Sequence, residues 1–160
     1  MKNQLIPIEP PYSPEITKAL SQYPQGDDGY IIKLFRVFAN SVRFLTNKGV
    51  VNLLDKESPL SLREREIVIL RVTANNDCEY EWGVHVAAFA EKAGFTQPQI
   101  AATLVVEVNT DLWSVEQLAI LRMVDELHEN SVITDSTWGL LSSCFSEEQL
   151  VELVMLSGLY

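Results

Sequence analysis

The sequence predicts an all-α fold, on the basis of three observations. Every long segment places its apolar residues at helical spacing, no stretch of real length alternates with period two, and capping residues precede the periodic segments. A hydrophobic share of 47% and a charged share of 21% over 160 residues are those of a globular protein with one ordinary core. We therefore expect a single helical domain over residues 13–160, preceded by an extended Pro-rich arm over residues 1–12.

The expected helices begin at recognisable capping signals. Ser13 precedes Pro14, a residue that suits the first position of a helix, and Ser61 stands three residues before Glu64, as in a capping box. The expected helices cover residues 14–23, 28–46, 61–74, 78–93, 97–106, 115–129, 136–144 and 147–160, with a short apolar turn over 49–54. Gly94 is expected to close the helix that starts at residue 78.

The charge balance and the apolar runs exclude two classes of partner. Asp and Glu number 22 against 12 Lys and Arg, so the net charge is -10 and no basic stripe is present to meet a nucleic acid. The longest apolar runs, such as Ile67–Leu70, are stopped at once by charge, so we expect no membrane-spanning segment. The N-terminal residues lack the apolar run of a secretion signal, which predicts a cytoplasmic protein with Cys78 and Cys144 as free thiols.

Both ends of the chain are expected to contact other surfaces. The arm over residues 1–12 is expected to lie over the body of the protein or over a neighbouring subunit. Residues 150–160 remain strongly apolar, with no polar cap after them. Either a partner chain covers that segment or the sequence is truncated within its last helix.

Four groups that exchange protons or electrons fall on two consecutive expected helices: Glu66, Cys78, Glu81 and His85. Glu81 and His85 are four residues apart, so the carboxylate can orient the imidazole and raise its basicity. Antiparallel packing of the two helices would bring Glu66 near His85. Backbone N–H groups at the start of the second helix favour a thiolate at Cys78, whereas Glu79 and Glu81 oppose it. We expect the four side chains to converge on one small cavity.

The same residues also have a purely structural interpretation. Glu66 can pair with Arg71 or Arg63 inside a helical bundle, with His85 as a satisfied buried residue. His128, near the end of a helix, is explained by its favourable interaction with the helix dipole, and no third ligand at recognisable spacing accompanies it. We therefore assign no metal.

The spacing of these residues resembles a known family. Glu66, Cys78 twelve positions later and His85 seven further on, followed by small and apolar residues, resemble the core of the carboxymuconolactone decarboxylase and alkylhydroperoxidase-D-like superfamily. The order Cys-x-Tyr-Glu-Trp-x-x-His over 78–85 is typical of one branch, and further likeness extends over 118–128 and 133–138. The resemblance covers most of the chain from about Asp28 to its end.

The resemblance implies a helical bundle assembled as homotrimers or homohexamers. In the alkylhydroperoxidase-D branch, a Cys-x-x-Cys pair cycles between dithiol and disulfide, so Cys78 matches the first Cys, with Glu66 and His85 as the proton relay and Tyr80 as a second relay group. The second Cys position is Glu81, and a carboxylate cannot close a disulfide. Because Cys144 is best explained as a core residue, a dithiol cycle is disfavoured, and a one-cysteine peroxidase stays open.

The decarboxylase branch of the family needs no metal and no cofactor. There, His85 oriented by Glu81 would return a proton to the carbon of a small carboxylic acid or lactone, with Glu66 as its partner. Arg71 or Arg63 would hold the substrate carboxylate, and Trp82 would wall the pocket. Three functions therefore remain open: a cofactor-free enzyme with a Glu/His proton relay, an antioxidant peroxidase acting through Cys78, and a non-catalytic oligomeric helical module.

Overall fold

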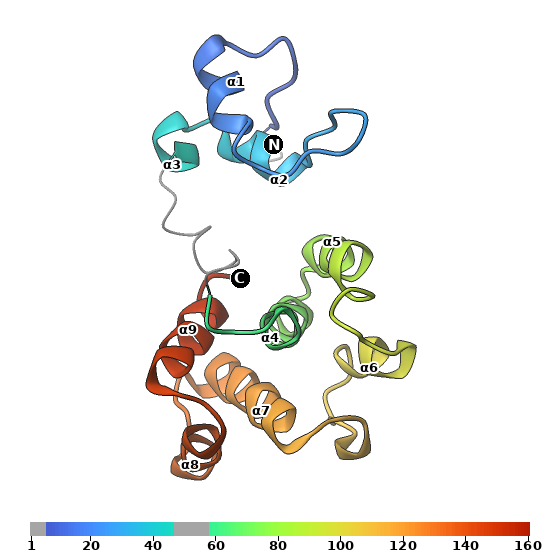
Figure 1. Cartoon of the computed structure of the whole chain (residues 1–160), viewed down its shortest axis with the longest axis vertical. Coiled ribbons are helices and arrows are strands. Elements are labelled where there is room, and N and C mark those ends of the chain that lie inside the picture. The colour runs from blue at the N-terminus through green and yellow to red at the C-terminus, as the bar shows by residue number, and fades with distance from the viewer. Residues whose placement is uncertain (1–5, 47–57) are drawn as a thin grey trace. The chain divides into compact units, whose positions relative to one another are not determined.

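The computed structural model of the chain describes residues 6–46 and 58–160, and all regular elements within these residues are helical (Figure 1). The prediction of an all-α fold is confirmed. The chain divides into two compact units, Met1–Val51 and Asn52–Tyr160, where the sequence predicted one domain from residue 13. The division follows from two separate clusters of buried apolar side chains, one in each unit.

The first unit holds three short helices, α1 (Pro14–Leu20), α2 (Lys33–Phe38) and α3 (Val42–Thr46). Ser13 caps α1 as predicted, because its hydroxyl accepts a hydrogen bond from the Ile16 N–H at 3.2 Å. The buried residues of this unit are Ala19, Leu20, Ile31, Ala39 and Leu45.

The Pro-rich arm packs on the first unit. The Ile8 N–H donates to the Arg36 carbonyl at 3.1 Å, and the Glu9 carboxylate forms an ion pair with the Arg36 guanidinium. Ile8 and Tyr12 pack against the apolar cluster of the same unit. In the described residues, the arm therefore covers the unit that follows it in the chain.

The prediction of one continuous helix over residues 28–46 was wrong. The structure has two short helices, α2 and α3, separated at residues 39–41. The Asn40 side-chain amide donates to the Val37 carbonyl and to the Ile6 carbonyl, both at 2.9 Å. A polar side chain that bonds nearby backbone carbonyls competes with the helical hydrogen-bond ladder, which explains the break. The apolar turn expected over 49–54 lies outside the described residues.

The second unit contains six α-helices and one short 3₁₀ helix within residues 58–160. They are α4 (Leu62–Asn75), α5 (Glu79–Phe89), α6 (Gln97–Ala102), η2 (Thr110–Leu112), α7 (Val115–Asn130), α8 (Asp135–Cys144) and α9 (Glu147–Ser157). Capping boxes start four of them, including the predicted box of Ser61 and Glu64 at α4. Such a box satisfies backbone N–H groups that a helix start leaves unpaired, so these starts were readable in the sequence.

Helix α4 is the central element of the second unit. It packs against α5, α7 and α9 (Figure 1), and its residues Ile67, Val68, Ile69 and Leu70 are all fully buried. A helix with four consecutive buried residues is covered on every side at that level. The polar side chains of Glu66, Arg71 and Thr73 on α4 are therefore buried among its neighbours.

Two of the predicted helices in this unit end earlier than expected. Helix α5 ends at Phe89 instead of residue 93, and a turn follows in which Gly94 has the left-handed φ of 72°. Helix α6 ends at Ala102 instead of residue 106. The Arg71 guanidinium takes the carbonyls of residues 103, 105 and 106, and this holds them out of a helical ladder.

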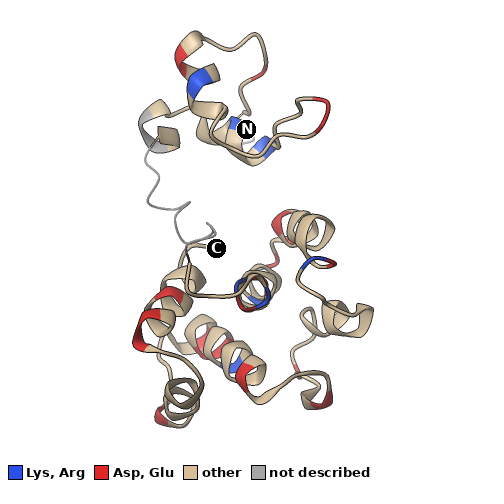
Figure 2. Cartoon of the chain, viewed as in Figure 1, with Lys and Arg blue, Asp and Glu red and all other residues tan. Residues whose placement is uncertain are grey.

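Acidic side chains outnumber basic ones in the sequence, and the described helices carry both kinds. Figure 2 shows Asp and Glu spread over the helices of both units, with fewer Lys and Arg among them. Among the described helices, none combines the length and the apolar character needed to cross a bilayer. Helix α9 buries Leu150, Leu153 and Leu156, while Val151 and Met155 are exposed.

Candidate functional site

A buried carboxylate–imidazole pair joins the two helices that carry the predicted site. Glu66 lies in the second turn of α4 and His85 in α5, and the Glu66 Oε2 atom is 2.9 Å from His85 Nδ1. Both residues are at most 5% exposed. The turn between the helices, in which Asp77 has φ of 52°, reverses the chain and lets α5 pack back on α4. The contact that antiparallel packing predicted is thus present.

Glu81 approaches the other nitrogen of the same imidazole. Its Oε1 atom is 3.6 Å from His85 Nε2, an ion-pair distance that is longer than a hydrogen bond. The predicted neighbour of His85 on the same helix face is therefore in place, but the shorter, orienting contact comes from Glu66. The Glu81 side chain is 13% exposed, against 4% for the side chain of Glu66, so Glu81 lies on the solvent side of the pair.

Tyr160 completes the surroundings of His85 and was missed by the sequence analysis. Its hydroxyl oxygen is 3.2 Å from His85 Nε2, and its ring meets the imidazole edge-on, at 87° with a centroid distance of 5.3 Å. Phe89, one turn further along α5, contacts the imidazole with a centroid distance of 5.3 Å. The contact of Tyr160 spans 75 positions of sequence, and no local pattern marks that residue as part of a site.

These contacts keep a positive charge on the imidazole. Burial by itself lowers the pKa of His85, but the carboxylates of Glu66 and Glu81 outweigh burial and raise this pKa to about 9. Burial, followed by the proximity of the same two carboxylates, raises the pKa of the Tyr160 phenol above its usual range. At neutral pH the site therefore holds an imidazolium that donates from both nitrogens, beside a protonated phenol.

Cys78 occupies a different environment from the buried pair. It is exposed at the N-cap of α5, and its thiol makes no hydrogen bond in the described part of the chain. Tyr80 is 51% exposed. The structure therefore brings Glu66, Glu81 and His85 together, while Cys78 and Tyr80 lie at the solvent-exposed start of the same helix.

Arg71, which the sequence analysis expected to hold a substrate carboxylate, is bound by oxygen atoms of the protein itself. Its Nε and Nη2 atoms donate to the two carboxylate oxygens of Asp125, at 2.6 and 2.9 Å. The remaining N–H groups donate to the carbonyls of Thr103, Val105 and Val106. Since a guanidinium has five N–H donors, these five bonds use all of them. These contacts favour a structural role for Arg71, and its expected place in the pocket stays a prediction.

The alternative ion pairs proposed for Glu66 are also absent. Arg71 pairs with Asp125, and Arg63 donates to the carbonyls of Ala93 and Gly94, at 2.9 and 2.8 Å. Arg63 instead closes the turn after α5, and this leaves the imidazole as the partner of Glu66.

Trp82 of α5 packs toward the core of the second unit. Its indole N–H donates to the Thr103 hydroxyl at 3.0 Å, and its ring packs against the main apolar cluster. Thr103 is fully buried and also accepts from Arg71 through its carbonyl. Trp82 therefore anchors α5 on the segment after α6, and no contact with His85 supports its expected role as a pocket wall.

The remaining candidates lie away from the pair. Cys144 is half-buried in α8 and packs against the core, as expected for a structural cysteine. His128 is exposed at the end of α7. Within residues 6–46 and 58–160, no group of three or more His, Cys, Asp or Glu side chains has an arrangement that could hold a metal ion.

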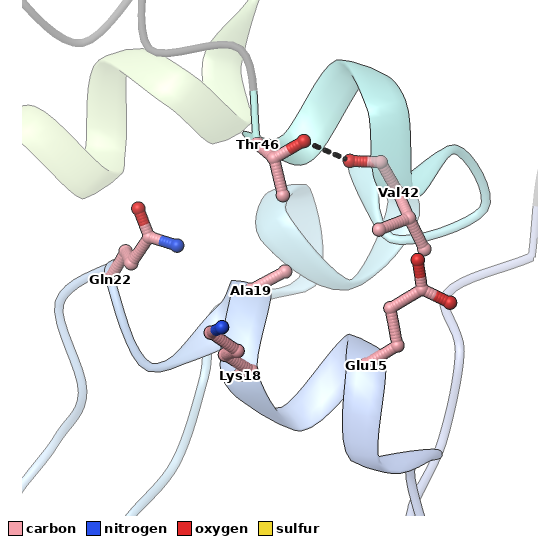
Figure 3. A pocket seen from close by; sticks show the side chains of 6 residues that line it. All are labelled: Glu15, Lys18, Ala19, Gln22, Val42 and Thr46. Atoms are coloured by element: carbon pink, nitrogen blue, oxygen red, sulfur yellow. Dashed lines mark hydrogen bonds between the residues drawn. The ribbon is translucent and has the colours of Figure 1, made fainter.

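Two surface cavities lie elsewhere in the structure. One, of about 420 Å³, is lined by the C-terminal ends of α4, α7 and α9 and includes His128. The other, of about 370 Å³, lies in the first unit between α1 and α3 (Figure 3), and its polar side chains are those of Glu15, Lys18, Gln22 and Thr46. Neither of these two cavities includes Glu66, Glu81 or His85, and Glu66 and His85 are both buried.

The fold and the site define a class of all-helical protein in which a central helical hairpin carries a buried carboxylate–imidazole pair. The sequence matches the model of the carboxymuconolactone decarboxylase family over residues 45–126, slightly more than half of the chain. The chain therefore belongs to the carboxymuconolactone decarboxylase family. The matched range contains Glu66, Cys78, Glu81 and His85, and Tyr160 lies outside it.

A solved structure supports the same fold. The chain resembles an uncharacterized peroxidase-related protein from Silicibacter sp. TM1040, with a TM-score of 0.78 and 23% sequence identity. The alignment covers 96% of this chain and 81% of that chain. At this identity the likeness establishes the fold alone. A comparison with curated proteins gave no match.

Proposed function

We propose that the protein is a cofactor-free acid–base enzyme that acts on a small carboxylic acid or lactone, with His85 as the proton donor. The observation that carries this proposal is the buried Glu66–His85 pair, with Nε2 directed away from Glu66. Burying a charged pair costs free energy, and such groups with strongly perturbed pKa values concentrate at functional sites. Family membership supports the same class of chemistry.

The proposed reaction uses the charge that the site already holds. In decarboxylation of a β-keto type acid, the bond to the carboxylate carbon breaks, carbon dioxide leaves, and the electron pair remains as an enolate. The Nε2–H of the His85 imidazolium then protonates the carbon, and the neutral imidazole recovers a proton from water. Glu66 keeps the imidazole oriented through Nδ1 and stabilises its charged form. Glu81, on the solvent side, is placed to help the return of the proton.

The test measures carbon dioxide release, or ring opening, from a panel of small β-keto acids and carboxylated lactones. His85→Asn keeps the size and polarity of the side chain but cannot donate a proton from an imidazolium, so turnover should fall by roughly 10²- to 10⁴-fold. His128→Asn is the matched control, since His128 is exposed and far along the chain. It should retain the turnover of the parent protein.

Loss of turnover in both histidine variants, or in neither, would contradict the proposed role of His85. If the His85→Asn and Glu81→Gln variants retained every measured turnover, a non-catalytic helical module would be the better account. Glu66→Gln separates orientation from proton donation, because it removes the charge at Nδ1 and leaves the imidazole in place.

A second candidate function is peroxide reduction at Cys78. The observation that favours it is the exposed thiol at the start of α5. The thiolate would attack one oxygen of a hydroperoxide, the O–O bond would break, and a sulfenic acid and an alcohol would form. Because Glu81 occupies the second Cys position, an external thiol must condense with the sulfenic acid and release water. A second external thiol then frees Cys78 as a thiol.

Cysteine variants distinguish the two functions. Cys78→Ser should abolish the consumption of organic hydroperoxide in the presence of an external thiol and should leave decarboxylation largely intact. Cys144→Ser, at the half-buried cysteine of α8, is the matched control and should keep both activities. Hydroperoxide consumption that survives in Cys78→Ser would exclude this second function.

A further inference from the structure

Tyr160 lies on the nitrogen of His85 from which the proposed enzyme must deliver its proton. Its hydroxyl oxygen is 3.2 Å from Nε2, while Nδ1 is already bound to Glu66 at 2.9 Å. The phenol ring stands edge-on to the imidazole and Phe89 lies against the same ring. With His85 only 5% exposed, these neighbours leave Nε2 almost no contact with solvent.

One proton on Nε2 has two acceptors. The imidazolium donates from both nitrogens, and its Nε2–H can reach the Tyr160 oxygen within hydrogen-bond distance or the Glu81 carboxylate at 3.6 Å. The phenol stays protonated, since burial and the carboxylates of Glu81 and Glu66 raise its pKa and outweigh the opposite effect of Arg65. The neutral Tyr160 hydroxyl therefore accepts the hydrogen bond from His85 Nε2–H. It lies where the proton acceptor of a substrate would have to lie.

We propose that Tyr160 is a positioning residue that holds the Nε2 proton of His85 and that a substrate must displace the Tyr160 hydroxyl before it receives this proton. The inference rests on the proposed function for its last step, the transfer to substrate. It explains why the Glu66–His85 pair is buried in this structure: the Tyr160 side chain occupies the position at Nε2 where a substrate would bind. The acceptor that replaces Tyr160 must reach Nε2 beside Glu81, whose Oε1 atom is 3.6 Å from the same nitrogen.

The first experiment tests the hydroxyl. Tyr160→Phe keeps the ring that covers His85 and removes the acceptor. NMR titration of the His85 imidazole should then give a pKa lower by roughly half a unit to one unit, because a hydrogen bond to the charged form is lost. Tyr12→Phe is the matched control in the first unit, and it should leave this titration unchanged. An unchanged titration in Tyr160→Phe would overturn the proposal.

The second experiment tests the cover over Nε2. Diethyl pyrocarbonate acylates an accessible neutral imidazole, and mass spectrometry locates the modified histidine. Tyr160→Ala should raise the rate of acylation at His85 by about tenfold or more, since modification of a buried group requires local opening. Tyr160→Phe should stay within about threefold of the parent protein by the same argument. Acylation at exposed His128 serves as the internal reference.

The outcomes separate this inference from the proposed function. An equal rate in Tyr160→Ala and in the parent protein would show that Tyr160 is not the cover, and equal acceleration in Tyr160→Phe would show that the ring does not shield Nε2. Either result overturns the inference. Neither measurement uses turnover, so a failure of His85 in the decarboxylation assay would remove the proposed function while the role of Tyr160 at Nε2 is judged independently.

Discussion

Two buried charged side chains in the second unit, Arg71 and His85, differ in how fully their N–H groups are hydrogen-bonded. All five N–H groups of Arg71 have oxygen acceptors, two from one carboxylate and three from backbone carbonyls. His85 has a carboxylate bond at Nδ1, whereas its Nε2 is shared between a neutral hydroxyl and a carboxylate beyond hydrogen-bond distance. Every N–H group of Arg71 thus has a fixed acceptor. The Nε2 proton of His85 can move between the Tyr160 hydroxyl and the Glu81 carboxylate.

The comparison separates a structural ion pair from a candidate catalytic one. A saturated guanidinium fixes the segment over residues 103–106 and has no donor left for a ligand. An imidazolium with one weakly held proton can give that proton away. Mutations at the two clusters should therefore differ in kind: those around Arg71 should affect stability, and those around His85 should affect titration and turnover.

The largest expected effect is the loss of Arg71. Arg71→Met should lower the free energy of unfolding by about 3–5 kcal/mol, because it leaves three backbone carbonyls without this donor and leaves Asp125 without its cation, with only the Asn75 amide still bound to it. Denaturant unfolding checks this value. Arg122→Met, at an exposed position of α7, is the control and should change stability by less than about 0.5 kcal/mol. A loss below about 1 kcal/mol in Arg71→Met would mean that water replaces the guanidinium, against the burial of its contacts.

The next effect is the pH dependence that His85 gives to stability. Its pKa in the folded protein is about 9, above the unfolded value of 6.5, so its contribution is complete below pH 6.5 and is lost as pH rises through 9. The free energy of unfolding should fall by roughly 3 kcal/mol over this window. Urea unfolding at several pH values measures the change.

A histidine variant isolates this contribution from other titrating groups. In His85→Asn the decrease between pH 6.5 and pH 9 should be smaller than in the parent protein, while His128→Asn should retain it. Equal slopes in the parent protein and in His85→Asn would show that folding does not raise the pKa of His85. Glu66 and Glu81 would then not stabilise a charged imidazole.

The two carboxylates around His85 should contribute unequally. Glu66→Gln removes the contact at 2.9 Å and should lower the pKa of His85 by roughly one to two units, the value of a hydrogen bond to a charged group. Glu81→Gln removes a contact at 3.6 Å and should lower it by less than one unit by the same argument. NMR titration of the imidazole measures both. The reverse order would make Glu81 the main partner, as the sequence analysis expected.

Local signals explain which parts of this structure were predictable from the sequence. The cap residues Ser13 and Ser61 and the helical spacing of apolar residues predicted the helix starts and the all-α class, since both signals lie within a few residues. The spacing of Glu66 and His85 predicted their contact because two consecutive helices joined by a short turn pack against each other. The family resemblance, found on the same residues, is confirmed by the match over residues 45–126.

Contacts between distant segments account for what could not be predicted. The ends of α2 and α6 depend on Asn40, which bonds the Ile6 carbonyl, and on Arg71, which bonds carbonyls more than thirty positions away. Tyr160 reaches His85 across 75 positions. No local sequence pattern predicts such partners, because they come together only when distant segments pack against each other. The catalytic roles of Cys78, Glu81 and His85 stay predictions.

The smallest effect concerns Trp82, which links the two clusters through Thr103. Its indole N–H donates to the Thr103 hydroxyl, and the carbonyl of this threonine accepts from Arg71. Trp82→Phe should lower the free energy of unfolding by about 1–2 kcal/mol, from one lost hydrogen bond and a smaller ring in the core. Trp138→Phe, at a residue that is 44% exposed, is the control and should cost less than about 0.5 kcal/mol.

The titration of His85 should be the same in both tryptophan variants, because the hydrogen bonds and ring contacts of the imidazole in the described residues are with Glu66, Tyr160 and Phe89. A shifted His85 pKa in Trp82→Phe would show that α5 moves when its anchor on Thr103 is weakened. In that case the saturated cluster around Arg71 would set the position of the imidazole. The two clusters would then be connected through Thr103: the Arg71 cluster would position α5, and the His85 cluster would hold the titrating proton.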